Sequence, residues 1–191
     1  MRMIYILLVS MIIPASEFHV IGDKSTIKWK GSKSTGSYHD GNILIKQGTV
    51  NIEKNILLNG KIIIDMNSIT CTDIEDENSN KYLVEHLENE DFFSVSQYPV
   101  AYLEIIKVTH KENNDYLITA DLTIKEHTHL VDFIATIKIN ENVAVATGKI
   151  DIDRAKYNIK YKSKTWYPDL GDRFINDIFE LYFNLIALPA S

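Results

Sequence analysis

The chain has 191 residues, of which 45% are hydrophobic and 24% charged, a composition typical of one globular domain and not of a disordered segment. It carries 20 basic and 26 acidic side chains, a formal net charge of -6, so its surface repels nucleic acid and anionic lipid headgroups. The only cysteine, Cys71, has no partner for an internal disulfide, and stability must therefore come from the core.

Residues 1–16 have the layout of a secretory signal peptide. Arg2 precedes an apolar block over residues 3–13, which is too short for a good membrane span, and Pro14, Ala15 and Ser16 follow it. The alternative is a buried N-terminal strand. We expect export to the periplasm or the medium, with cleavage after Ala15 or Ser16. Export leaves one domain over residues 17–191, with a net charge of about -7 (19 basic against 26 acidic residues) and without stable membrane insertion.

From residue 25 onward, apolar residues recur mostly at every second position, which predicts strands with one buried face. Eight such runs occur, at residues 25–32, 41–53, 57–69, 100–110, 116–125, 130–140, 143–154 and 179–188. Several are separated by polar links at hairpin spacing, which predicts antiparallel neighbours. Residues 156–176 are expected to form a long loop before the last strand.

One segment, residues 72–93, departs from this period. Leu83, His86 and Leu87 share a face at helical spacing, and Asn78 or Ser79 is available as an N-cap. The sequence therefore predicts one short helix in the connection between the third and fourth strands.

An all-β chain of eight antiparallel strands forms either a sandwich or a closed barrel, and closure removes the exposed edges that promote aggregation. The interior of such a barrel is just wide enough to be filled by side chains or to hold one small ligand. The more apolar alternate set on each strand is expected to point inward. The candidate ligand-binding residues from that set are Trp29, Ile43, Ile45, Ile64, Met66, Ala101, Leu103, Ile105, Ala120, Leu122, Phe133, Ala135, Gly148, Ile150, Phe179, Leu181 and Phe183.

Two features decide whether this interior is full. A bulge at Gly48 would shift the register, so that Val50 and Ile52 become the inward set of their strand. Small inward residues near strand middles leave a void if they lie at similar heights, unless large neighbours such as Phe133 and Phe183 close it. An apolar void stays dry and favours an apolar guest. A chain of about 20 carbons would gain on the order of 16 kcal/mol before ordering costs.

Six ordered motifs carry a resemblance to a known family. They are "HDGNILIKQGTV" (39–50), "IDMNSI" (64–69), "HLENEDFFSVSQYPVAYLE" (86–104), "ADLTIKEHTHLVDF" (120–133), "KIDIDRAKYNI" (149–159) and "LGDRFINDIFELYFNLIA" (170–187). With these motifs the chain resembles the YceI family of bacterial secreted lipid-binding proteins over about residues 25–187. The resemblance departs at two positions, where Glu126 stands in place of the usual Gly and Leu130 in place of Pro. Glu126 argues against a tight glycine turn at that corner.

The resemblance implies a lipocalin-like, eight-stranded antiparallel barrel, extended along its axis. Its apolar tunnel would bind or transport a long isoprenoid, an isoprenoid quinone or a similar amphiphilic chain, without catalysis and without a cofactor. In this family the segment around Phe92 and Phe93 is a helix and turn packed by the barrel. Both rings are therefore expected to plug or border one end of the interior, while the acidic run before them faces water.

The histidines suggest the one alternative function that involves catalysis. His127 and His129 are two apart and would share a strand face, and with His39 or His86 they would form a metal site if the fold gathers them. A metal-dependent enzyme using His39, His127 and His129 is thus an alternative function, although solvated or hydrogen-bonded histidines near the barrel rim are the simpler explanation of the pattern. The sequence has no G-x-S-x-G, H-E-x-x-H or P-loop motif. A further alternative is a filled barrel that acts through its surface.

Arg154 continues the inward parity of its strand, so it would meet a ligand headgroup or pair with an acidic neighbour such as Asp91 or Asp172. Trp166 and Tyr167 would form a lid over one mouth or pack on the surface. The sequence leaves the oligomeric state open, a homodimer included.

Overall fold

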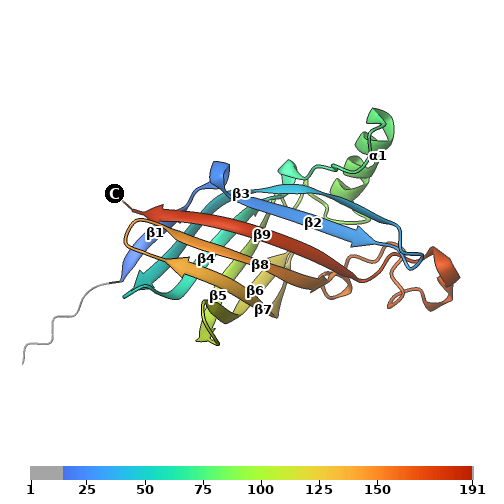
Figure 1. Cartoon of the computed structure of the whole chain (residues 1–191). Helices are drawn as coiled ribbons and strands as arrows, with labels where there is room; N and C mark the ends of the chain where they lie inside the picture. Colours follow the sequence, from blue (N-terminus) through green and yellow to red (C-terminus); the bar gives the residue numbers. More distant parts are fainter. Residues whose placement is uncertain (1–14, 191) are drawn as a thin grey trace, which may run out of the picture.

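The computed structural model describes residues 15–190, which form a closed ring of antiparallel strands (Figure 1). Of the predicted signal peptide, residues 1–16, all but the last two residues lie outside this range. The strands are β1 Ser16–Val20, β2 Thr26–Ser32, β3 Tyr38–Glu53, β4 Ile56–Asp65, β5 Val100–His110, β6 Asp115–Ile124, β7 His127–Ile139, β8 Ala144–Asp153 and β9 Ile178–Pro189. One α-helix, α1 Glu77–Glu88, and four short 3-10 helices, η1 Gly22–Lys24, η2 Met66–Ser68, η3 Arg154–Tyr157 and η4 Pro168–Arg173, complete the described part.

The sheet order confirms the predicted eight-stranded antiparallel barrel. Going round the ring, β3 is followed by β2, β9, β8, β7, β6, β5 and β4, and pairing between β4 and β3 closes it. The helix lies between β4 and β5, as expected. The ring contains one strand more than predicted, because β1 joins it as well.

The extra strand β1 shares one position in the ring with β2. Both strands lie between β3 and β9, with β2 beside the first part of β3 and β1 beside its last part. Ser25 holds the junction, since its hydroxyl donates to the carbonyl of Ile21 at 2.8 Å and accepts from the amide of Ile186 at 3.0 Å. The ring is therefore continuous across the break between β1 and β2.

The expected register shift in β3 occurs, but two residues earlier than predicted. Ile45 lies opposite Ile64 and Gln47 lies opposite Ile63, so Lys46 is the extra residue of the bulge. After the bulge the inward parity changes, and Ile52 is only 4% exposed. A single extra residue reverses which face a strand presents, so both halves of β3 turn apolar side chains inward.

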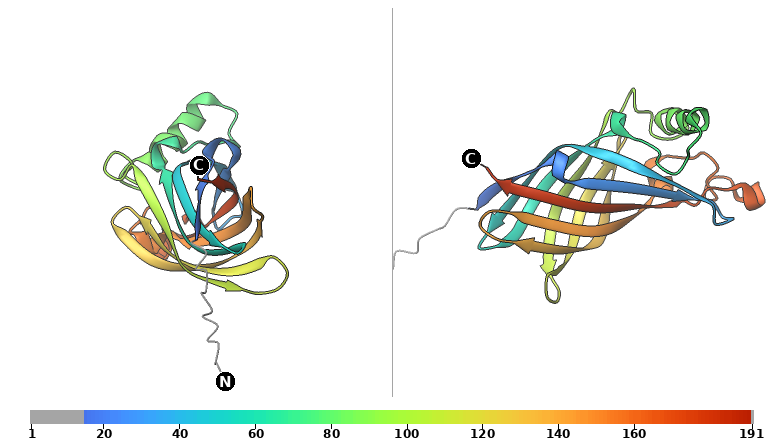
Figure 2. Two further views of the ribbon diagram at one scale, coloured as in Figure 1. Left: turned by 90° about the vertical axis from the view of Figure 1, so that its left-hand side faces the viewer. Right: turned by 45° about the horizontal axis from the view of Figure 1, so that its top comes forward.

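Helix α1 stands outside the ring at one end of the barrel, which Figure 2 shows from two directions. Its N-cap is Asp76, whose carboxylate accepts from the amide of Ser79 at 2.8 Å, so the predicted caps Asn78 and Ser79 were wrong. Asp76 is acidic and sits where the helix dipole favours negative charge. The helix contains one buried residue, Leu87. None of the helices within residues 15–190 has the length and apolar character of a membrane span.

The corner between β6 and β7 is a tight turn. Ile124 pairs with His127, which leaves only Lys125 and Glu126 in the loop. Lys125 takes the left-handed conformation, with a φ of 56°. The expectation that Glu126 disfavours such a turn was wrong, because the residue before it supplies the positive φ.

Candidate functional site

The barrel interior holds two adjoining apolar cavities, each with a volume of about 120 Å³. The β1 chamber lies at the end where β1 sits and includes Val20, Ile52 and Ala187 in its lining. The α1 chamber lies at the end next to α1 and includes Trp29, Phe92 and Phe93. Both are lined by Ile27, Ile64, Leu122 and Leu181, so these four residues form the waist between them.

Most of the predicted ligand-binding residues line one chamber or the other. Those in the β1 chamber are Leu103, Ile105, Phe133, Ala135, Ile150 and Phe183. Those in the α1 chamber are Trp29, Ile43, Met66, Phe92, Phe93, Ala101, Arg154 and Phe179. Ile64, Leu122 and Leu181 belong to the waist. Strand alternation thus brings these side chains together, while their role toward a ligand stays a prediction.

Three predicted residues line neither chamber. Ala120 is fully buried in the packed wall, and Ile45 is partly buried against the core. At Gly148 an added Cβ would lie 2.6 Å from Cζ of Phe183, so this glycine makes room for the ring of Phe183. Ala101 and Ala135 do face the chambers, so the small residues leave a partial void and not one open tunnel.

Sequence reasoning missed part of the lining at both ends. At the β1 end it missed Val20, Leu57, Ile139, Ala144 and Ala187, which lie at strand termini. At the α1 end it missed Ile69, Leu87, Ile159 and Ile175. Ile159 and Ile175 lie between η3 and β9, where no period of two marks the inward side. Their one signal is that they are the only isoleucines in a stretch, residues 158–177, that consists mostly of polar and aromatic residues.

The α1 end of the interior is closed by aromatic rings. Phe92, which is 9% exposed, packs between His86 and Tyr161 with centroid distances of 5.1 and 5.5 Å. Phe93 meets the ring of Phe179 at 6.4 Å. Glu90 and Asp91 are exposed, as predicted for the acidic run. Edge-to-face packing of this kind, together with ring burial, stabilises a polar segment across the barrel mouth.

Arg154 lines the α1 chamber and is only 3% exposed. Its guanidinium donates to the backbone carbonyls of Asn176, Ile159, Tyr161 and Ile175 at distances between 2.9 and 3.1 Å. The carboxylate of Asp177 lies 3.4 Å from Nη2, so the acidic partner is Asp177 and neither Asp91 nor Asp172. With its donors occupied by the backbone, Arg154 ties η3 to the loop before β9.

Electrostatics around Arg154 reflect its burial. Desolvation lowers the pKa of Arg154, and the charge of Asp177 opposes that shift. Burial acts to raise the pKa of Asp177, but hydrogen bonds from the amide and hydroxyl of Thr165 and the charge of Arg154 hold it below its usual range. Burial, with a smaller contribution from Asp153, raises the pKa of Tyr157 to about 12. At neutral pH Arg154 in the chamber lining is therefore compensated by Asp177 behind it, and Tyr157 is a neutral phenol.

The histidines do not form the metal site that the alternative function needs. His39 Nδ1 lies 2.9 Å from the carboxylate of Asp73, and His129 Nε2 lies 2.9 Å from the carbonyl of Lys156. His127 is next to Glu126, at 3.6 Å. Across residues 15–190, no three His, Cys, Asp or Glu side chains lie close enough together to hold a metal ion. Each histidine instead has a separate local partner.

Trp166 and Tyr167 lie on the surface. They are 44% and 50% exposed, and Nζ of Lys160 stands 4.2 Å from the centre of the Trp166 ring. Neither residue lines a chamber. The structure therefore places them in a surface-packed loop and not in a lid.

Solved structures share this architecture. BcnA of Burkholderia cenocepacia aligns with a TM-score of 0.70 at 20% identity, covering 87% of this chain and 98% of its own. A polyisoprenoid-binding domain of Saccharophagus degradans, implicated in plant cell wall breakdown, aligns with a TM-score of 0.64 at 15% identity, covering 92% and 99%. The YceI protein of Campylobacter jejuni aligns with a TM-score of 0.54 at 14% identity, covering 100% and 91%. At these identities the likeness establishes the fold.

No curated protein matches the sequence. The model of the YceI-like domain matches residues 18–187, which is nearly all of the described barrel and includes both chambers. The chain therefore belongs to the family of YceI-like domains.

Proposed function

We propose that this protein binds a long apolar or amphiphilic chain, such as an isoprenoid or an isoprenoid quinone, in the two chambers and carries it without chemical change. The observation that carries this proposal is the lining. The β1 chamber is lined by apolar residues alone, and the α1 chamber adds only Arg154 and Asn176 as polar side chains. A dry apolar cavity favours an apolar guest. The polyisoprenoid-binding domain among the structural neighbours supports the same ligand class.

The volume of the chambers limits what fits without movement. A cavity of about 150 Å³ accepts one benzene, which is about 25 Å³ per carbon. Two chambers of about 120 Å³ each therefore match about ten carbons, or two isoprene units. A longer chain needs side chains at the waist to change rotamer, and we expect Leu122 and Leu181 to move first because their side chains are unbranched at Cβ.

A series of isoprenoid alcohols tests the proposal. Delipidated protein is incubated with geraniol, farnesol or geranylgeraniol, which have two, three and four isoprene units, and bound mass is read by native mass spectrometry. We expect stoichiometric uptake that competes with any lipid co-purified from cells. Leu181→Trp, at the waist, should reduce uptake of the longer alcohols most, whereas Tyr182→Trp on the outer face should not. Absence of uptake of every alcohol by wild-type protein would contradict the proposal.

We also propose that the chain is exported. The support is the charge and apolar pattern of residues 1–13 in the sequence. Cleavage after Ala15 would leave all of β1, which begins at Ser16, in the mature protein. The mass of protein recovered from the periplasmic fraction tests this, with Ser16 expected as the first residue. A full-length mass confined to the cytoplasm would contradict export.

A further inference from the structure

The wall of the barrel is unpaired over one stretch between β7 and β8. The two strands pair only from Ala135 to Ile139 on β7 and from Ala144 to Gly148 on β8. The earlier part of β7 is paired with β6 on its other side, and the later part of β8 is paired with β9. Within residues 15–190, neither part has a ladder partner on the side where β7 and β8 should meet. Figure 1 shows the two strands leaving their shared hairpin.

This stretch, which we name the β7–β8 slit, is bounded at both ends. At one end Ala135 pairs with Gly148. At the other end the His129 side chain contacts η3, through the carbonyl of Lys156 at 2.9 Å and the ring of Tyr157 at a centroid distance of 5.2 Å. Residues 130–134 lie between these closures, a length of about 16 Å at the usual strand rise.

Behind the slit lie the two chambers. Phe133 and Ile150 flank it and line the β1 chamber, while Ile152 lines the α1 chamber. The slit therefore runs alongside the junction of the two chambers. A chain passing through it would reach both chambers without first crossing the waist.

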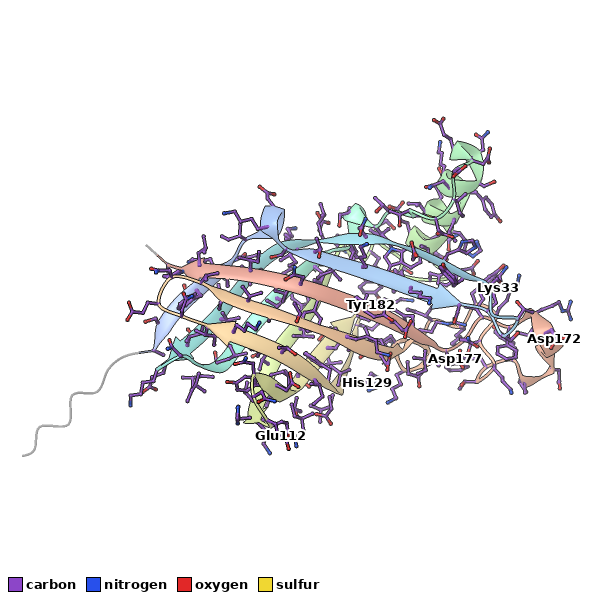
Figure 3. The ribbon with its side chains drawn as sticks, in the orientation of Figure 1. Lys33, Glu112, His129, Asp172, Asp177 and Tyr182 are labelled. Carbon is purple, nitrogen blue, oxygen red and sulfur yellow. The ribbon has the colours of Figure 1, made fainter. Side chains whose placement is uncertain are left out.

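The outer surface beside the slit carries both charged and apolar side chains, since Asp132 on β7 and Lys149 and Asp151 on β8 are exposed. On β7, Leu130 is 63% exposed and Ile134 is 48% exposed. On β9, next to β8, Ile178 is 48% exposed and Tyr182 is 43% exposed. Figure 3 labels His129 and Tyr182, which mark the two sides. The charged side chains on the slit edges disfavour association of two copies through these edges. The exposed apolar side chains Leu130 and Ile134 offer contact to an apolar molecule.

The two ends of the barrel offer poorer routes. Phe92 and Leu87 are buried at the α1 end, where the Arg154 hydrogen bonds fix the adjoining loop. At the β1 end, Phe18 and Ile52 are each 4% exposed and β1 is paired on both sides. Opening either end breaks backbone or side-chain hydrogen bonds, whereas widening the slit breaks no ladder bonds.

We propose that the ligand chain enters and leaves the barrel sideways through the β7–β8 slit. This inference rests on the proposed function. On this route Leu130 and Ile134 make the first contact with the ligand chain, and the hydrogen-bonded ends of the barrel stay closed.

A reversible cross-link tests the route. Extending the observed register places Asp132 opposite Asp151, and both are exposed. The double variant Asp132→Cys/Asp151→Cys, in a Cys71→Ala background, is closed by oxidation, or by a short bis-methanethiosulfonate where the thiols do not meet. The matched control is Lys138→Cys/Val145→Cys, which bridges a pair that is already joined in the same two strands.

Each variant is loaded with farnesol while reduced, then cross-linked and mixed with excess phosphatidylcholine vesicles. Native mass spectrometry follows the loss of bound farnesol. We expect release to slow at least tenfold in the cross-linked slit variant, to recover on reduction, and to stay unchanged in the control.

Three results would overturn the inference. Equal release rates in the cross-linked and reduced slit variant would overturn the sideways route while leaving ligand binding intact. Failure of wild-type protein to load any of the three alcohols would overturn the proposed function, and the inference with it. A dimer of the reduced protein in size-exclusion chromatography, converted to monomer by the slit cross-link, would show that the unpaired edges join two copies of the chain.

Discussion

Substitution of Ala146 by leucine should affect stability and ligand binding in opposite directions. Ala146 lines the β1 chamber and lies between Ile137 on β7 and Leu185 on β9. The change adds three carbons, or about 75 Å³ at about 25 Å³ per carbon. That volume is smaller than the chamber, at about 120 Å³, so leucine fits without displacing the strands.

The magnitude follows from the volume filled. Residual cavity volume costs about 24 cal/mol per Å³, so filling about 75 Å³ should stabilise the ligand-free protein by up to about 1.8 kcal/mol. The same three carbons are lost to a ligand, at about 0.8 kcal/mol each, which gives about 2.4 kcal/mol of binding energy. We therefore expect affinity for farnesol to fall by about 50-fold.

Urea unfolding of delipidated protein measures the first effect, and competition for farnesol measures the second. Thr147→Leu is the control, because Thr147 is exposed on the opposite face of the same strand. It should change neither quantity by more than a few tenths of a kcal/mol. A less stable Ala146→Leu protein that retains full farnesol affinity would refute the reasoning, since the chamber would then be neither empty nor the binding site.

Three further substitutions test other features of the barrel. Arg154→Met should cost about 3–5 kcal/mol of unfolding free energy in urea, because it leaves the Asp177 carboxylate without its buried partner. Arg173→Met, at an exposed site, should cost little. Equal costs for the two variants would contradict the ion pair and hydrogen bonds assigned to Arg154. Since the pKa of Asp177 is held below its usual range, its contribution should be complete above about pH 4 and be lost as pH falls through the depressed folded value. The difference in unfolding free energy between wild type and Asp177→Asn should therefore shrink in acid. A difference that grows in acid would contradict a lowered pKa for Asp177 in the folded protein. Lys125→Gly should stabilise the protein by about 0.5–1 kcal/mol in thermal unfolding, because glycine adopts the positive φ of this position without strain. Glu126→Gly should not stabilise it. A gain in stability for Glu126→Gly alone would show that Lys125 is not the strained residue.

Which side chains of a regular strand point inward could be predicted from the sequence, and most of the chamber lining followed from that prediction. Trp29, Phe133 and Leu181 lie on strands in which one alternate set is largely apolar while the other is mixed, so the period of two determined their direction. Val50 and Ile52 required a bulge, and the position of a bulge depends on the pairing with β4, which a single strand does not encode.

Other parts of the site could not be predicted for physical reasons. Strand β1 has only five residues and adjoins the expected signal peptide, so Phe18 and Val20 gave too short a pattern to recognise. The partners of Arg154 are backbone carbonyls in an irregular loop, and hydrogen bonds to carbonyls leave no mark on side-chain identity. The chamber volume depends on rotamers, as Phe183 over Gly148 illustrates.

The shared position of β1 and β2 has a consequence for folding. From β3 to β9 each strand pairs with its predecessor, so hairpins can form in sequence as the chain emerges. Strand β9 must also find β1 and β2, at least 150 residues earlier. Ring closure is then a single late event with a large loop-closure entropy, which slows folding. Until the last strand arrives, the apolar lining of both chambers is open to water.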